Sequence, residues 1–217
     1  MALSVDVVSD VICPWCFIGK RRIFKALNAI KDQYEFHVTW YPFQLNPDIP
    51  PGGMDRKAYR SAKFGSWETS LELDAHATAV GATEGIPFAF DRIQRTPNTF
   101  DAHRLIWLAQ CEGIQDAMVE ALFRSYFIEA ADIGNRRTLL EIAIATGLNA
   151  ERVERFLESN DGVAAVQEEE AKARRMGISG VPHFIINGEY SLSGAQAVQT
   201  MISAFDQALK LAEVKRG

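Results

Sequence analysis

The sequence VICPWCFIGKRR, from Val11 to Arg22, decides how the rest of the chain is interpreted. It places Cys13 and Cys16 two residues apart, at the point where one hydrophobic pattern gives way to another. A cysteine pair with this spacing occurs in metal sites, in small structural disulfides and in redox centres. The elements on either side of the pair help to distinguish these possibilities.

The cysteine pair lies between a predicted strand and a predicted helix. The run from Leu3 to Val11 is short, mostly apolar and rich in branched residues, as expected for a strand covered on both faces. Pro14 suits the first turn of a helix, and apolar residues then recur at spacings of four and three, at Ile23, Leu27 and Ile30. Alternation from Phe36 to Tyr41 predicts a second strand, which completes a right-handed βαβ unit.

The other end of the chain supplies the rest of a sheet. FIINGEYSL, Phe184 to Leu192, has Asn187-Gly188 at its centre, a strong signal for a tight hairpin, and an amphipathic helix follows it. The intervening sequence has mainly helical patterns after a turn-rich segment. We therefore predict an α/β protein with a mixed central sheet in residues 1–50 and 177–217, interrupted by a helical insertion in residues 51–176.

Composition excludes several classes of function. The chain has 217 residues, of which 47% are hydrophobic, and a net charge of −5, so it offers no electrostatic footprint for nucleic acid or an anionic membrane. No segment has the ~18 apolar residues of a membrane span. The N-terminal residues show no basic leader, and Asp6 and Asp10 interrupt any apolar signal core, so we expect a cytoplasmic location.

Redox chemistry is the interpretation of the cysteine pair that remains. A structural zinc site needs four ligands, and beyond the pair the chain offers only Cys111 and four scattered histidines, so no metal site is predicted. A disulfide across two residues closes too small a loop to contribute much stability. A helix N-terminus favours thiolate, which makes Cys13 the predicted nucleophile and Cys16 the thiol that resolves a mixed disulfide.

A second motif supports this interpretation. In GISGVPHF, Gly177 to Phe184, a glycine and Pro182 stand at the start of the hairpin strand. This combination suggests a tight turn of the kind that admits a cis peptide bond before the proline.

With these motifs in place, the chain resembles the DsbA-like branch of the thioredoxin superfamily. SDVICPWCFIGKRR, NTFDAHRL (Asn98 to Leu105) and GVPHFIING are similar more narrowly to its FrnE-type members. The resemblance implies a thioredoxin-like fold with a large helical insertion. It also implies thiol-disulfide oxidoreductase or disulfide isomerase activity on protein or small-molecule disulfides, with no bound cofactor and glutathione as one candidate redox partner.

Carried over by position, the resemblance assigns roles to the motif residues. Cys13 matches the attacking cysteine and Cys16 the resolving one, with Pro14 and Trp15 as the dipeptide between them. Val181-Pro182 matches the cis-proline dipeptide that binds substrate beside the site.

Two departures from the family pattern bear on the chemistry. Val7 stands where many members carry a buried acid that accepts a proton, and Asp10 is the candidate replacement. Trp15 stands where strongly oxidising members have histidine, so an imidazole that would stabilise thiolate is missing. An oxidant is strong when its reduced form is stabilised, so we expect a more reducing couple that acts as a reductase or isomerase in a reducing compartment.

Two other functions stay open. The same fold resembles kappa-class glutathione transferases and hydroxychromene-carboxylate isomerases, which bind glutathione but typically place serine where Cys13 stands. A binding module with incidental cysteines would be indifferent to alkylation of Cys13.

The remaining candidate residues receive structural predictions. Among the aromatics Trp15, Phe17, Trp67, Phe88 and Phe90, only Trp15 is expected to line a substrate groove. Cys111 is predicted to be a buried small residue, and His103 to cap and pack a helix. The i,i+4 pairs Glu168–Lys172 and Glu170–Arg174 are predicted to lie on a solvated helix face.

Overall fold

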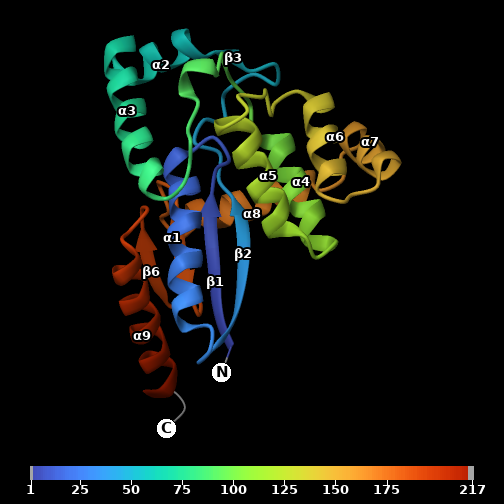
Figure 1. Cartoon of the computed structure of the whole chain (residues 1–217). Coiled ribbons are helices and arrows are strands. Elements are labelled where there is room, and N and C mark those ends of the chain that lie inside the picture. Colours follow the sequence, from blue (N-terminus) through green and yellow to red (C-terminus); the bar gives the residue numbers. More distant parts are fainter. Residues whose placement is uncertain (1, 215–217) are drawn as a thin grey trace.

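The computed structural model describes residues 2–214 and contains a four-stranded mixed sheet (Figure 1). The strand order is β2-β1-β5-β6, with β1 (Ala2–Ser9) parallel to β2 (Glu35–Pro42) and antiparallel to β5 (His183–Ile186). The hairpin to β6 (Tyr190–Ser193) turns at Asn187 and Gly188, both with positive φ, as the Asn-Gly signal predicts. The predicted mixed sheet is confirmed.

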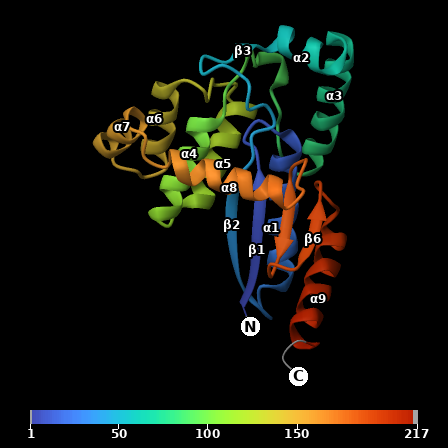
Figure 2. The ribbon, with the colours of Figure 1, turned by 180° about the vertical axis from the view of Figure 1, so that it is seen from behind.

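Helices cover both faces of this sheet. α1 (Pro14–Ile30) joins β1 to β2 and packs beside α9 (Val198–Val214) on one face. α8 (Val163–Arg175) crosses the other face (Figure 2). Because β1 is covered on both sides, its apolar residues are buried whichever way they point: Leu3, Val5, Val7 and Val8.

Besides α8, the segment between β2 and β5 in sequence contains further helices. Two of them lie beyond the end of the sheet where α1 begins (Figure 1), namely α2 (Arg56–Phe64) and α3 (Trp67–Thr83). The others are α4 (Phe100–Cys111), α5 (Gln115–Phe127), α6 (Arg136–Ala145) and α7 (Ala150–Glu158), with a 3₁₀ turn, η1, at Phe90–Arg92. The division into domains at residues 50 and 177 stays a prediction.

A two-stranded pairing was not predicted. β3 (Met54–Asp55) pairs antiparallel with β4 (Arg95–Thr96) near the start of α2. Strands of two residues are too short to show the alternation by which a strand is recognised in sequence.

The segment NTFDAHRL begins α4 and anchors the helices around it. Arg104 is 3% exposed, and its guanidinium donates to the backbone carbonyls of Phe156, Ser159 and Asp161 at 2.7–3.0 Å and to the Asp101 carboxylate at 2.7 Å. One buried side chain therefore holds the end of α7 and the turn after it against α4.

Two sequence predictions about surface and core were wrong. Cys111, the last residue of α4, is exposed. Glu170 is 9% exposed: its carboxylate accepts the Gln44 N–H at 2.9 Å as well as the predicted Arg174 partner at 2.7 Å. It therefore ties α8 to the chain after β2. Glu168 pairs with Arg175, at 2.5 Å.

No helix within residues 2–214 is long and apolar enough to cross a membrane.

Candidate redox site at the start of α1

Cys13 is the N-cap residue of α1. Its backbone is extended (φ −92°, ψ 113°), and Pro14 begins the helix, where the missing N–H of proline costs no hydrogen bond. The Cys13 N–H donates to the Asp10 carbonyl at 3.0 Å, and its own carbonyl accepts the Cys16 N–H at 3.0 Å. A tight turn after β1 therefore places the Cys13 sulfur at the positive end of the helix dipole.

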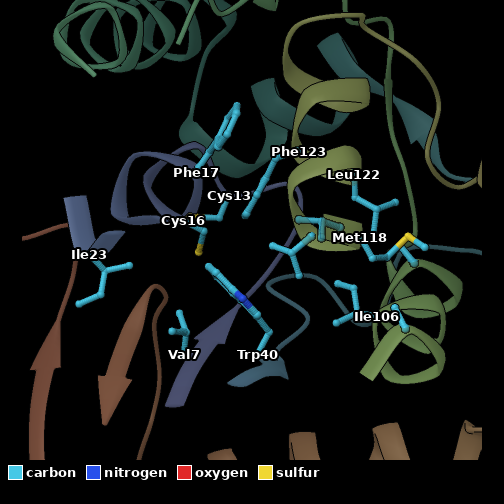
Figure 3. Close-up of a cluster of buried hydrophobic side chains, with 14 of the residues drawn as sticks. Val7, Cys13, Cys16, Phe17, Ile23, Trp40, Ile106, Met118, Leu122 and Phe123 are labelled. Carbon is cyan, nitrogen blue, oxygen red and sulfur yellow. The ribbon is translucent and has the colours of Figure 1, made fainter. Parts of the chain in front are cut away.

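The two thiols differ in exposure and in acidity. Cys13 is 5% exposed and lines a cleft, whereas Cys16 is 1% exposed and its side chain is directed into a buried cluster with Trp40 and Val7 (Figure 3). Burial raises the pKa of the Cys16 thiol well above its ordinary value, and the neighbouring Cys13 thiol raises it further. Cys16 is therefore a protonated thiol at neutral pH.

The Val181-Pro182 dipeptide lies against the first cysteine. The Cys13 thiol donates to the Val181 carbonyl with a sulfur–oxygen distance of 3.6 Å, and the Val181-Pro182 bond is cis. α1 comes close to this segment at Gly19, where an added Cβ would lie 3.0 Å from Pro182 and 3.1 Å from Phe184. Residues from the two ends of the chain thus build one site.

The cleft above Cys13 has a volume of about 370 Å³. Cys13, Pro14, Trp15 and Val181 line it, whereas Cys16 and Pro182 are buried and do not. The opposite wall comes from α2 and α3. Among its residues are Tyr59, Arg60, Lys63, Phe64 and His76, none of which the sequence singled out.

The α2 and α3 side of the cleft carries both charged and aromatic side chains. Lys63 is exposed and donates to Asn46 and, at 3.0 Å, to the Tyr59 hydroxyl, while Arg60 donates to Asp74 at 2.8 Å. The Trp15 ring packs against His76 with a centroid distance of 5.4 Å. The cleft can therefore hold a ligand with an apolar part and a negative charge.

Only one of the predicted aromatics borders the cleft. Phe17 and Phe90 are buried, and Phe88 packs with both rings; Trp67 lies against Arg56 instead. Of these five aromatic residues, Trp15 lines the cleft as expected; that the cleft binds substrate stays a prediction.

A polar cluster beneath the cysteines was only partly predicted. Asp10, the candidate replacement for the acid missing at Val7, is fully buried, and its Oδ2 accepts the Leu45 N–H at 2.8 Å. Its Oδ1 lies 3.4 Å from Nε2 of His103, which is 3% exposed. His103 packs in α4 as predicted, but its partner comes from a distant part of the chain.

Comparison with known proteins agrees with this geometry. Residues 4–206 match the model of the DSBA-like thioredoxin domain. The chain belongs to this family. The DsbA-like thioredoxin fold predicted from the sequence motifs is therefore confirmed.

Several solved structures share the fold. A probable DsbA oxidoreductase from Streptomyces coelicolor is 31% identical, with a TM-score of 0.89 over 96% of this chain and 90% of the other. A 2-hydroxychromene-2-carboxylate isomerase is 16% identical, with a TM-score of 0.74 over 97% and 98% of the two chains. The cytosolic disulfide reductase DsbM of Pseudomonas aeruginosa, solved with glutathione, is 19% identical, with a TM-score of 0.61 over 99% and 100%.

Proposed function

We propose that this DsbA-like protein is a thiol-disulfide oxidoreductase or isomerase whose redox centre is Cys13 and Cys16. The observation that carries the proposal is the asymmetry of the pair: Cys13 lines the cleft at the start of α1, and Cys16 is buried one helical turn further on. A nucleophilic thiol needs access to substrate, whereas a resolving thiol needs only to reach its neighbour.

In the reducing direction, the Cys13 thiolate attacks one sulfur of a substrate disulfide. A Cys13–substrate bond forms, the substrate S–S bond breaks, and the other substrate sulfur leaves as a thiolate. Cys16 then loses its proton and attacks the Cys13 sulfur. The Cys13–Cys16 disulfide forms, and the second substrate thiolate leaves, so the substrate gains two electrons and the enzyme loses two.

Val181 is the proposed docking point for the substrate backbone. Its carbonyl accepts the Cys13 thiol proton in this structure and becomes free to accept an N–H once Cys13 is bonded to substrate. An extended peptide pairing with this segment would bring its own sulfur to Cys13. Pro182, buried beside Gly19, holds the segment against α1.

The proposed substrates are thiol- or disulfide-containing proteins and peptides, with glutathione as a redox partner. Lys63 offers an exposed positive charge at the cleft to a peptide carboxylate. The absence of an imidazole at Trp15 favours a reducing couple. The similarity in fold to DsbM, a cytosolic disulfide reductase solved with glutathione, supports the same direction and a cytoplasmic location.

Trapping of mixed disulfides tests the proposal. All variants carry Cys111→Ser, because Cys111 is exposed and would react independently. With glutathione disulfide, Cys16→Ser should accumulate one glutathione per chain, detected by intact mass, and Cys13→Ser should accumulate none. Equal turnover of insulin disulfides by both variants and the parent would exclude the pair as the redox centre.

A second candidate function is a glutathione-dependent isomerase. It is favoured by the match in fold to 2-hydroxychromene-2-carboxylate isomerase over nearly the whole of both chains. The Cys13→Ser variant separates the two functions, because related isomerases typically carry serine at this position. Isomerisation of a hydroxychromene carboxylate by this variant, without disulfide exchange, would favour the isomerase.

A further inference from the structure

The Trp15 ring packs against an imidazole that comes from a different helix. His76 of α3 lies beside it with a distance of 5.4 Å between the ring centroids and an angle of 51° between the planes. α3 lies beyond the end of the sheet where α1 begins (Figure 1), and the two helices are in contact. The dipeptide between the cysteines contains no histidine, and the fold brings one to it from α3.

His76 faces the space in which the proposed exchange takes place. The residue is exposed, and it lines the same cleft as Cys13 and Trp15. In the part of the chain that the structure describes, its imidazole has no hydrogen bond or ion pair to another residue. Packing against Trp15 therefore holds the ring in place, and both of its nitrogens are available to a ligand in the cleft.

The first step of the proposed function places a negative charge in this cleft. When Cys13 attacks a disulfide, the substrate sulfur that is displaced leaves as a thiolate. An alkyl thiol such as free cysteine has a pKa of about 8.5, so at neutral pH the displaced sulfur takes up a proton. Histidine changes charge between pH 5 and 8, so it can donate that proton and regain one from solvent.

We propose that His76 is the general acid that protonates the displaced sulfur of the substrate. The inference rests on the proposed function. The Cys13 thiolate forms a bond to one substrate sulfur, the substrate S–S bond breaks, and its electron pair passes to the other sulfur. This sulfur takes the proton of the His76 imidazolium and leaves as a thiol. The neutral imidazole then takes up a proton from solvent through the open cleft.

Other ionisable groups lie around His76 and bear on any pH dependence. Glu72 precedes it by one turn of α3, and five more described residues besides Cys13 line the cleft: Tyr59, Arg60, Lys63, Asp74 and Tyr126. Burial raises the pKa of Tyr126, so it stays neutral, and a guanidinium stays charged. Side chains of the other types keep their charge between pH 6 and pH 8. Cys13 can titrate in this range, so the experiment must cancel its contribution.

The dependence of the rate on the leaving group tests the proposal. All proteins carry Cys16→Ser and Cys111→Ser, so that Cys13 is the only thiol and only the first step occurs. Two uncharged disulfides are compared. Bis-nitrophenyl disulfide releases an aryl thiolate that leaves without a proton, whereas bis-hydroxyethyl disulfide releases a basic alkyl thiolate. His76→Gln is measured beside the parent from pH 6 to pH 8, with His37→Gln, at an exposed position of β2, as the matched control.

The proposal predicts an effect confined to the alkyl disulfide. At pH 6, His76→Gln should lower the rate constant for bis-hydroxyethyl disulfide at least about fivefold, measured by intact mass after acid quenching, because a general acid assists a basic leaving group. The rate with bis-nitrophenyl disulfide, measured by absorbance, should change less than about twofold. The ratio of the two rates cancels the thiolate fraction of Cys13. In this ratio, the difference between parent and variant should shrink towards pH 8, as histidine loses its proton.

The possible outcomes separate this proposal from the proposed function. Equal rates for the parent and His76→Gln with both disulfides overturn the general acid and leave the redox function intact. Equal slowing with both disulfides assigns His76 to the positioning of Trp15 and also overturns it. A loss with the alkyl disulfide that stays constant from pH 6 to pH 8 overturns it as well. Failure of Cys13 in the parent to react with either disulfide overturns the redox function itself.

Discussion

The Cys13 sulfur lies 3.6 Å from the Val181 carbonyl oxygen, although the two residues are 168 positions apart in sequence. The contact joins the start of the first helix to the segment that precedes the hairpin, so the surroundings of the proposed nucleophile are complete only when the two ends of the chain have packed together. Chemistry at Cys13 is therefore a sensitive measure of whether this packing is correct.

Alkylation should distinguish the cysteines. In Cys111→Ser protein, limiting iodoacetamide at neutral pH should label Cys13 at least about tenfold faster than Cys16, because only Cys13 lines the cleft and burial raises the pKa of Cys16. Peptide mapping by mass spectrometry measures the ratio. Labelling of Cys16 first would contradict the assigned roles.

Packing at Gly19 should affect both stability and activity. Gly19→Ala adds a methyl group 3.0 Å from the Pro182 ring and 3.1 Å from the Phe184 ring, closer than ordinary van der Waals contact, so these rings or α1 must shift by a few tenths of an ångström. Overpacking of this kind costs about 1–3 kcal/mol, and the better helix propensity of alanine offsets up to ~1 of it. We expect a net loss of about 1 kcal/mol in urea unfolding and slower insulin reduction.

Gly52→Ala is the matched control, since apart from the glycine and its chain neighbours no heavy atom of the described residues lies within 4 Å of the added methyl group. It should change neither quantity. A Gly19→Ala protein with parental stability and turnover would show that α1 and Pro182 do not need to be in such close contact.

Local patterns predicted the sheet and the position of the cysteines well. The βαβ unit follows from a change in hydrophobic period around Pro14, and the hairpin follows from Asn187-Gly188, whose left-handed backbone (φ 51° and 71°) these residue types tolerate. Each of these signals is contained within a few consecutive residues. No tertiary information was needed to interpret them.

The parts that were missed depend on partners distant in sequence. Nothing near His103 shows that Asp10 will lie 3.4 Å away, and nothing near Glu170 shows that Gln44 will cover it. The residues of α2 and α3 that line the cleft likewise could not be predicted, because they reach it only through the packing of these helices near the start of α1. Spacing identifies which face of a helix can be buried, but not what covers it, as the exposed Cys111 demonstrates.

The Arg104 anchor should be a major source of stability in the helical region. Arg104→Ala removes the donor from three backbone carbonyls, of which the one of Phe156 is buried, and from Asp101. Hydrogen bonds to charged groups contribute about 1.5–3 kcal/mol each when counted singly, and the buried Phe156 carbonyl loses this donor, so we expect a loss of at least about 3 kcal/mol. Urea unfolding followed by circular dichroism gives the value.

Arg137→Ala is the control for loss of an arginine from a helix. Arg137 is 88% exposed and pairs with Glu141 on its own helix, so its removal should change stability by less than about 0.5 kcal/mol. Similar losses in the two variants would refute the anchoring role of Arg104.

The last prediction concerns pH and the contact between α3 and α1. Burial raises the pKa of the Glu84 carboxyl. Hydrogen bonds from Lys25 and Arg22 on α1, both at 2.6 Å, lower it by more, so the pKa lies below its ordinary value of 4.5. A carboxyl with a depressed folded-state pKa stabilises the protein above its unfolded pKa and loses this contribution as pH falls through the folded value. Glu84→Gln should therefore cost about 1 kcal/mol at pH 7, and the difference from the parent should shrink below about pH 4.5. Urea unfolding at several pH values measures this, with the exposed Glu151→Gln as control; a difference that stays constant from pH 7 to pH 3 would exclude an ionised Glu84 as its cause.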